Sequence, residues 1–151
     1  MMSNPLRTLA WKVVKTLVNR QFPTVKSISI DKLAVWLAGD MPPPELIDVR
    51  KREEYEVSHL PDALHLPTVE AIQRAAIPAN ATLVLYCSVG YRSARVAQQL
   101  QETGYKNVMN LEGSMFEWYN RGHPVVVDSQ PVEQVHPYSR IWGLLLERCA
   151  G

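Results

Sequence analysis

The segment 87–93 combines residue types that could carry out nucleophilic sulfur chemistry: Cys87, Ser88, Val89, Gly90, Tyr91, Arg92 and Ser93. It follows an apolar stretch, Thr82–Tyr86, and precedes a helical pattern that ends near Gly104. A loop between a buried strand and a helix turns backbone N–H groups inward, and the helix adds its free N–H groups and the positive end of its dipole. Because this loop favours negative charge, we predict that Cys87 is a nucleophile held as a thiolate over an anion-binding site.

Several residues of this loop also have a purely structural interpretation. Cys87 could be a buried structural cysteine, but inert burial does not explain the glycine and the arginine that follow it. Gly90 can adopt the positive φ angle that a tight loop requires. Arg92 is a cation in the first turn of a helix, where cations are unfavourable, and it therefore indicates an anionic partner. Ser93 could equally well cap the helix or contact a substrate.

Short apolar segments alternate with helical patterns along the central part of the chain. We predict strands near residues 25–28, 46–49, 64–66, 82–86 and 108–111, and helices near residues 30–37, 69–76, 92–103 and 115–120. A charged turn or a short helix is predicted near residues 53–57. This alternation predicts an α/β fold with a parallel sheet that is flanked by helices on both faces. Ligands of such sheets bind beyond the carboxyl ends of the strands, which is where chain order places Cys87.

Two apolar segments lie outside this alternation. An amphipathic helical spacing is formed by Leu6, Leu9, Ala10, Val13, Val14, Leu17 and Val18, and Ile141–Leu146 predicts a short C-terminal helix. We expect an N-terminal helical extension at 1–22, a main domain at 23–127 and a C-terminal extension at 128–151. The first helix either packs on the domain or lies on a membrane surface, and its modestly charged polar face favours packing. The C-terminal helix could dock beside it or form a homodimer contact.

Composition excludes several classes of protein. The 151 residues suit one main domain, and 16 Lys and Arg against 15 Asp and Glu leave no broad basic surface for nucleic acid. No run approaches about 18 apolar residues, so no transmembrane segment is expected. Cys87 and Cys149 are too few for a zinc knuckle or a disulfide framework, and a sulfur relay or a disulfide between them is the less favoured alternative. We expect a soluble, cytoplasmic protein that needs no metal or cofactor.

Three segments, in order, resemble the single-domain rhodanese family of persulfide-forming sulfurtransferases. The first contains Leu46-Ile47-Asp48-Val49-Arg50, Glu54-Tyr55 and His59-Leu60-Pro61-Asp62-Ala63; the second is 87–93; the third contains Leu111-Glu112-Gly113, Trp118, Gly122, Pro124 and Val125. The resemblance covers residues 28–127. The sequence departs from the family pattern at three positions that usually hold glycine, namely Ser58, Asp62 and Ser114. These departures concern loop geometry more than chemistry.

The resemblance implies a rhodanese-like sheet and double-displacement chemistry. Cys87 would attack the outer sulfur of a small anionic donor such as thiosulfate, become a persulfide and release sulfite. A thiol, cyanide or a protein sulfur acceptor would then remove the sulfur. The loop amides from Ser88 to Ser93 would stabilise the persulfide, and Arg92 would orient the anionic donor. The resemblance assigns structural support beneath the loop to Asp48, Arg50 and His59.

Two other functions share parts of this pattern. Cysteine phosphatases and arsenate reductases resemble a Cys-x5-Arg loop, whereas only four residues separate Cys87 from Arg92. The shorter loop makes a smaller cradle, which fits a sulfur atom better than a tetrahedral phosphate. A non-catalytic rhodanese-like binding module would usually lack the nucleophile, and here the cysteine is present. An intact cysteine nevertheless does not prove turnover, so this alternative stays open.

Overall fold

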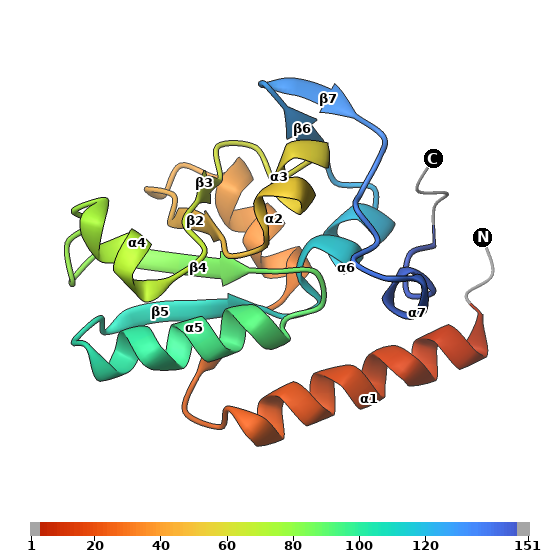
Figure 1. Cartoon of the computed structure of the whole chain (residues 1–151), viewed down its shortest axis with the longest axis horizontal. Helices are drawn as coiled ribbons and strands as arrows, with labels where there is room; N and C mark the ends of the chain where they lie inside the picture. Colours follow the sequence, from red (N-terminus) through yellow and green to blue (C-terminus); the bar gives the residue numbers. More distant parts are fainter. Residues whose placement is uncertain (1–3, 148–151) are drawn as a thin grey trace.

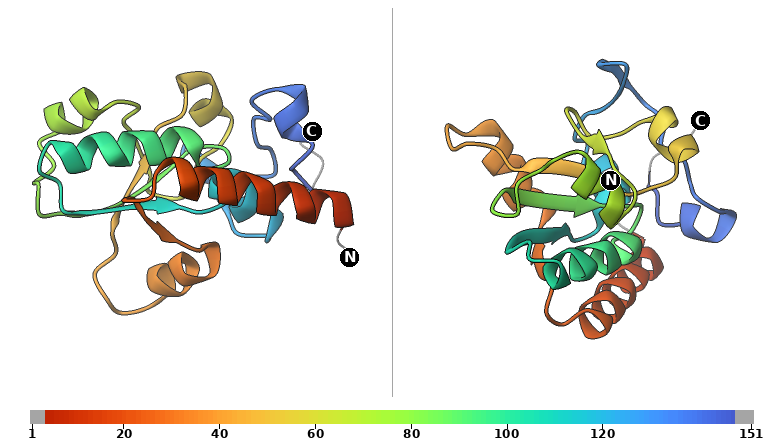
Figure 2. Two further views of the ribbon diagram at one scale, coloured as in Figure 1. Left: turned by 90° about the horizontal axis from the view of Figure 1, so that it is seen from below. Right: turned by 60° about the vertical axis from the view of Figure 1, so that its left-hand side comes forward.

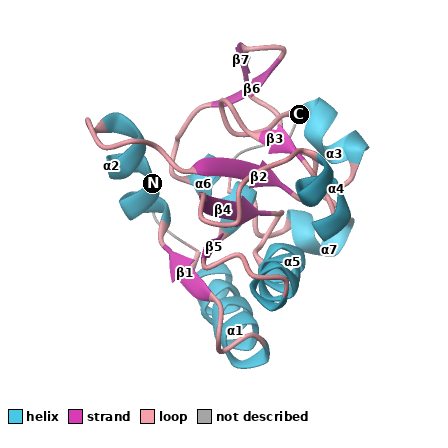
Figure 3. Ribbon diagram, turned by 90° about the vertical axis from the view of Figure 1, so that its left-hand side faces the viewer, coloured by secondary structure: helices cyan, strands magenta, loops and turns pink. Residues whose placement is uncertain are grey.

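A sheet of five parallel strands forms the centre of the protein. The computed structural model describes residues 4–147, and the sheet order is β1-β5-β4-β2-β3 (Figure 1). The strands are β1 (Lys26–Ile28), β2 (Glu45–Asp48), β3 (Leu64–His65), β4 (Thr82–Tyr86) and β5 (Asn107–Leu111). All neighbouring pairs are parallel, and Figure 3 shows the strands one above another in this order. The strand that leads into Cys87, β4, is therefore the central one.

Helices cover both faces of this sheet, as the sequence predicted. One face carries α2 (Ile30–Ala38) and α6 (Ser114–Asn120), and the other carries α4 (Val69–Arg74) and α5 (Tyr91–Glu102). Figure 2 shows α2 and α5 on opposite sides of the strands. The short helix α3 (Arg52–Val57) follows β2. The predicted α/β architecture is confirmed.

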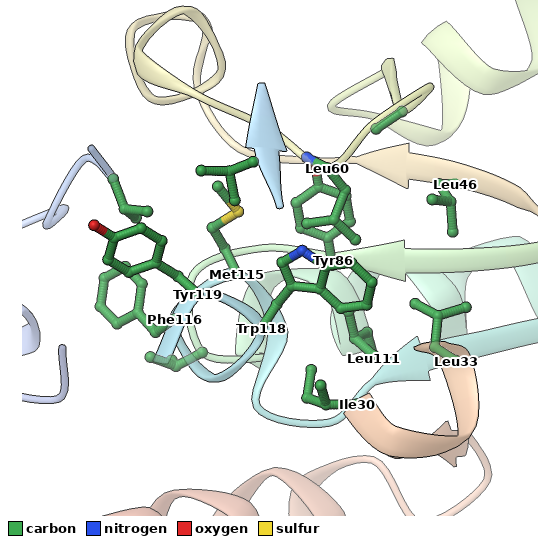
Figure 4. Close-up of a cluster of buried hydrophobic side chains, with 14 of the residues drawn as sticks. Ile30, Leu33, Leu46, Leu60, Tyr86, Leu111, Met115, Phe116, Trp118 and Tyr119 are labelled. Atoms are coloured by element: carbon green, nitrogen blue, oxygen red, sulfur yellow. The ribbon is translucent and has the colours of Figure 1, made fainter. Parts of the chain in front are cut away.

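Each face of β4 packs into its own apolar cluster. Val84 and Tyr86 point towards the α2 and α6 side, where they meet Leu33, Phe116 and other apolar side chains (Figure 4). Leu83 and Leu85 point towards α4 and α5. These four β4 side chains are fully buried, which explains why this parallel strand is continuously apolar instead of alternating. Since side chains alternate along a strand, the next odd position, Cys87, belongs to the α5 side.

The N-terminal helix α1 (Pro5–Gln21) packs on the domain along a stripe that is rotated from the predicted face and only partly matches it. Its buried residues are Trp11 and Val18, and Val18 shares a buried cluster with Ala94 of α5. Ala10, Val14 and Val18 of the predicted face pack against the domain, whereas the other four residues of that face are exposed, with exposed fractions of 49–76% at Leu6, Leu9, Val13 and Leu17. Trp11 explains the rotation, because it is the largest apolar side chain of the helix and it joins the core cluster of α2 and α6.

An ion pair also joins α1 to α6. The Lys15 ammonium of α1 lies 2.7 Å from the Glu117 carboxylate of α6. Figures 1 and 2 show α1 running alongside α5 and continuing beyond it.

The C-terminal segment adds a hairpin that the sequence analysis did not predict. Strands β6 (Val125–Val127) and β7 (Gln130–Val132) pair antiparallel, so the expected domain boundary at residue 127 falls inside this hairpin. The helix α7 (Arg140–Gly143) follows, and Leu145 and Leu146 are buried after it. The backbone oxygen of Leu144 accepts a hydrogen bond of 3.0 Å from the Arg7 side chain. The end of α7 therefore lies against α1, as one of the two alternatives from the sequence expected.

The predictions about a membrane span and about Cys149 remain to be compared with the structure. Across residues 4–147, no helix has the length and apolar character needed to cross a membrane. The predicted alternative roles of Cys149 lie outside the described residues.

Candidate active site

The sulfur of Cys87 lies at the carboxyl end of β4, in the loop that joins β4 to α5. The residue is 1% exposed. The Gly90 backbone N–H donates a hydrogen bond of 3.1 Å to the sulfur, and the Ser93 hydroxyl lies 3.4 Å from it. Of these two groups, the Gly90 N–H donates to the sulfur, whereas the single proton of the Ser93 hydroxyl goes to the Asn110 side-chain oxygen at 2.6 Å. The loop therefore directs a backbone donor at the sulfur and places a hydroxyl beside it.

Gly90 lets the chain turn from this loop into α5. It is the N-cap of the helix, with a φ angle of 110°, which side chains other than glycine rarely adopt. The first N–H groups of α5, from Tyr91 onwards, have no acceptor within the helix. The prediction that Ser93 could cap the helix is wrong, because Ser93 is fully buried in the first turn. Because Gly90 is the N-cap, α5 begins at Tyr91, earlier than predicted, and Ser93 lies in the first turn with its hydroxyl towards the Cys87 sulfur.

Asn110 holds the two ends of the loop together. Its side-chain oxygen accepts a hydrogen bond of 2.6 Å from Ser93, and its amide group donates one of 3.0 Å to the Gly90 carbonyl. Asn110 is buried in β5, the neighbour of β4. Sequence analysis missed this residue, although a polar residue inside an apolar strand is a usable signal, because buried polar groups require partners.

Ser114 supports the start of the loop from the opposite direction. Its hydroxyl accepts a hydrogen bond of 3.2 Å from the Cys87 backbone N–H and donates one of 2.8 Å to the Leu111 carbonyl. The hydroxyl thus connects the peptide group of Cys87 to the end of β5.

The three residues that replace the family's usual glycines adopt two different backbone conformations. Asp62 and Ser114 have φ angles of 63° and 50°, so both keep the left-handed conformation that glycine adopts easily. Ser58 has a φ angle of −173°, which is ordinary extended backbone. The loop geometry at Asp62 and Ser114 is therefore glycine-like, at a conformational cost that side-chain contacts such as those of Ser114 must offset.

Arg92 has an anionic partner within the protein itself. Its guanidinium donates two hydrogen bonds to the Glu54 carboxylate, at 2.8 and 2.9 Å, and a third of 2.8 Å to the Ser88 hydroxyl. Ser88 in turn donates to Glu54 at 3.1 Å. Glu54 comes from α3 and is 1% exposed. Sequence analysis predicted an anionic partner for Arg92 but did not identify Glu54.

The charge of Glu54 is stabilised by this arrangement. Burial alone would raise the pKa of the carboxyl, but hydrogen bonds from Arg92 and from the Lys51 backbone N–H act in the opposite direction. Together with the nearby positive charges of Arg92 and Arg50, they lower the pKa from 4.5 to about 2. Glu54 is therefore a carboxylate throughout the neutral pH range, and Arg92 is a neutralised cation.

The residues expected to support the loop form a buried network next to β4. Asp48 and Arg50 are both fully buried and are joined by hydrogen bonds of 2.8–3.2 Å. Arg50 also donates to the Ser58 carbonyl at 2.6 Å. The His59 ring stacks on Tyr55 with centroids 3.8 Å apart. These contacts tie α3 and the following loop to the end of β2.

A cavity of about 450 Å³ opens over the loop. Its floor includes Cys87, Ser88, Val89, Tyr91 and Arg92, so the structure brings most of the predicted loop residues to one surface. Buried Ser93 and Gly90 lie behind it. The cavity walls come from α1 and from the segment around Tyr138 and Trp142. Within residues 4–147, no cluster of three His, Cys, Asp or Glu residues is arranged to hold a metal ion.

Comparison with known proteins agrees with this geometry. The chain is 37% identical to a sulfurtransferase of Allochromatium vinosum over 82 residues, which cover 54% of this chain and 77% of that protein. It is 35% identical to the putative sulfur carrier protein YrkF of Bacillus subtilis over 74 residues, 48% of this chain but only 40% of that protein. The crystal structure of a rhodanese-like domain protein from Staphylococcus aureus superposes with a TM-score of 0.60 and 30% identity, covering 70% of this chain and all of that one.

The matched region contains the whole candidate loop. The family model of the rhodanese-like domain matches residues 31–121, which is more than half of the chain and includes Cys87, Arg92 and Asn110. The resemblance seen in the sequence is confirmed, and the chain belongs to the rhodanese-like domain family.

Proposed function

We propose that this protein transfers sulfane sulfur through a persulfide on Cys87. The observation that carries the proposal is the position of the Cys87 sulfur. It lies at the floor of an open cavity, has the Gly90 N–H directed at it and has the Ser93 hydroxyl 3.4 Å away. A thiolate in this environment is both stabilised and reachable by a substrate.

The proposed reaction has two displacement steps. The Cys87 thiolate attacks the outer sulfur of thiosulfate, a new S–S bond forms, and sulfite leaves with the electron pair of the broken bond. Cyanide or a thiolate then attacks the terminal sulfur and returns Cys87 to its thiolate form. The negative terminal sulfur of the persulfide would be stabilised by first-turn N–H groups of α5, which have no acceptor inside the helix.

The pairing of Arg92 favours this chemistry over phosphate hydrolysis. A phosphatase loop needs an arginine whose guanidinium is free to clamp the phosphate oxygens. Here Glu54 already occupies two guanidinium donors of Arg92 and Ser88 a further contact. We therefore assign Arg92 the role of holding the loop, with thiosulfate attracted mainly by the loop amides.

The similar proteins suggest where the sulfur goes. One is named a sulfurtransferase and another a putative sulfur carrier protein. We propose that the acceptor of this chain is either a small thiol or a protein that receives sulfur.

Intact-protein mass spectrometry tests the proposal. Incubation with thiosulfate followed by desalting should add about 32 Da, one sulfur atom, and cyanide should remove it with formation of thiocyanate. Cys87→Ser should abolish the adduct, because a hydroxyl is nearly isosteric but far less nucleophilic. Cys149→Ser is the matched control and should retain it. An adduct that persists in Cys87→Ser would refute the assignment, and an unmodified wild-type protein would favour a non-catalytic binding module.

A further inference from the structure

The cavity over Cys87 is built largely from parts of the chain outside the matched family region. The match spans residues 31–121, whereas Val14, Leu17 and Val18 line the cavity from α1, and Tyr138 and Trp142 line it from the C-terminal segment. Figure 1 shows α1 and α7 on the side of the molecule to which β4 points. The two extensions therefore give this active site walls that the rhodanese-like domain alone does not supply.

These walls are apolar, and some of their side chains are not otherwise packed. Leu17 is 59% exposed and Trp142 is 37% exposed, although both are large apolar residues. Water-exposed apolar surface that borders a reactive group is typical of a ligand site, and the volume of about 450 Å³ lies within the usual range for small molecules.

The charge of the cavity argues against a site built for inorganic anions alone. Apart from the reacting Cys87, Arg92 alone among its described lining residues carries a charge, and Glu54 pairs with it through two hydrogen bonds. The Tyr138 ring covers the same guanidinium, 4.5 Å from its carbon atom. Tyr138 has a φ angle of 65°, an unfavourable conformation for a bulky residue. The C-terminal segment thus closes over the cation and presents an aromatic surface in its place.

We propose that the cavity binds the apolar group of an organic sulfane-sulfur donor, so that Cys87 takes sulfur from a compound whose substituent contacts Leu17 and Trp142. This inference rests on the proposed function and specifies its substrate class. With an aryl thiosulfonate, the Cys87 thiolate attacks the outer sulfur, an S–S bond forms, the bond between the outer sulfur and the sulfonyl sulfur breaks, and the aryl sulfinate leaves with the electron pair. Charge and atoms balance, and no oxidant or reductant is needed.

Paired donors isolate the contribution of the apolar group. Benzenethiosulfonate and methanethiosulfonate share the reacting sulfur and the charge and differ in the substituent. The measured quantity is the ratio of their kcat/KM values, compared between variants so that intrinsic reactivity cancels. We expect Leu17→Gln and Trp142→Ala each to lower this ratio roughly three- to ten-fold, as expected for losing part of the contact with one ring.

Leu9→Gln is the matched control. Leu9 lies on the same helix with an exposed fraction of 58%, against 59% for Leu17, but does not line the cavity. It should leave the ratio unchanged. If the wild type takes sulfur from both donors but neither Leu17→Gln nor Trp142→Ala changes the ratio, or if Leu9→Gln changes it equally, the substrate assignment is wrong and the proposed function stands. If the wild type takes no sulfur from thiosulfate or from either thiosulfonate, the proposed function itself fails.

Discussion

Replacing Glu54 with glutamine would test how the active-site loop is held. In the folded protein the carboxylate accepts hydrogen bonds from Arg92 and Ser88 and has a pKa of about 2, against 4.5 without these contacts. That shift corresponds to roughly 3 kcal/mol of stabilisation of the charged form. Arg92 is 29% exposed, so solvent screens part of the interaction. We therefore expect Glu54→Gln to lower the free energy of unfolding by about 2 kcal/mol at pH 7.

The pH dependence of this loss gives the sharper test. The pKa of Glu54 is lower in the folded state than in the unfolded state, so its contribution is fully present above pH 4.5 and is lost as the pH falls towards about 2. Urea unfolding of the wild type and of Glu54→Gln at about pH 7, 5 and 3 should therefore show a difference that is similar at the two higher values and much smaller at the lowest.

Glu56→Gln provides the control on the same helix. The Glu56 side chain is 61% exposed and lies 3.6 Å from Arg52, so its removal should cost only a few tenths of a kcal/mol. A loss in Glu54→Gln that is as large at pH 3 as at pH 7, or one no greater than that of Glu56→Gln, would refute the interpretation that the ion pair holds the loop.

Three further predictions address other parts of the structure. Arg92→Ala should lower kcat/KM roughly tenfold for thiosulfate and by a similar factor for an uncharged sulfur donor, because the guanidinium holds the loop through its hydrogen bonds to Glu54 and Ser88. A loss confined to thiosulfate would show that Arg92 binds the anion directly. Gly113→Ala should lower the free energy of unfolding by about 2–3 kcal/mol in urea, because the added Cβ would collide with Glu117 and the φ angle is 80°. Gly122→Ala has a similar φ angle of 82° but open space around the added Cβ, so it should lower the free energy of unfolding by only about 1 kcal/mol. Equal losses in the two variants would contradict this prediction. Deletion of residues 1–21 should lower the melting temperature by on the order of 10 °C, because it removes the apolar burial that Trp11 and Val18 provide. The folded fraction should still accept sulfur from thiosulfate. An unchanged melting temperature together with loss of vesicle binding would favour the membrane-surface alternative.

Much of the framework followed from the sequence because its signals are local. The prediction of the strand at residues 82–86 agrees with β4, and the helix predicted near residues 30–37 agrees with α2, which Ser29 and Gly39 cap. Hydrophobic periodicity and capping depend on residues only a few positions apart, so they can be read along the chain. The same holds for the placement of Cys87, because a buried strand followed by a glycine and a helix defines the loop without reference to distant parts.

The sequence also left gaps where a feature was short or weakly patterned. The β6 and β7 strands have three residues each, and β7 contains Pro131, which removes a ladder donor and weakens the strand signal. The stripe of α1 that packs was predicted only in part: Val18 was included and Trp11 was not, because Leu6, Leu9, Val13 and Leu17 fit the helical period equally well. The choice between two apolar stripes depends on the surface that receives the helix.

The sequence by itself determined the α/β class, the order of the elements of the sheet domain and the place of Cys87 in the loop after a buried strand, since each depends on neighbouring residues. Only the tertiary structure decided that Arg92 is neutralised by Glu54, 38 positions away along the chain, and that Asn110 holds Gly90 and Ser93 together. It also decided that α1 and the segment around Trp142 wall the cavity over Cys87. Partners of this kind are set by how the strands pair and where the helices dock, and residues far apart in the chain carry no local pattern that specifies those contacts.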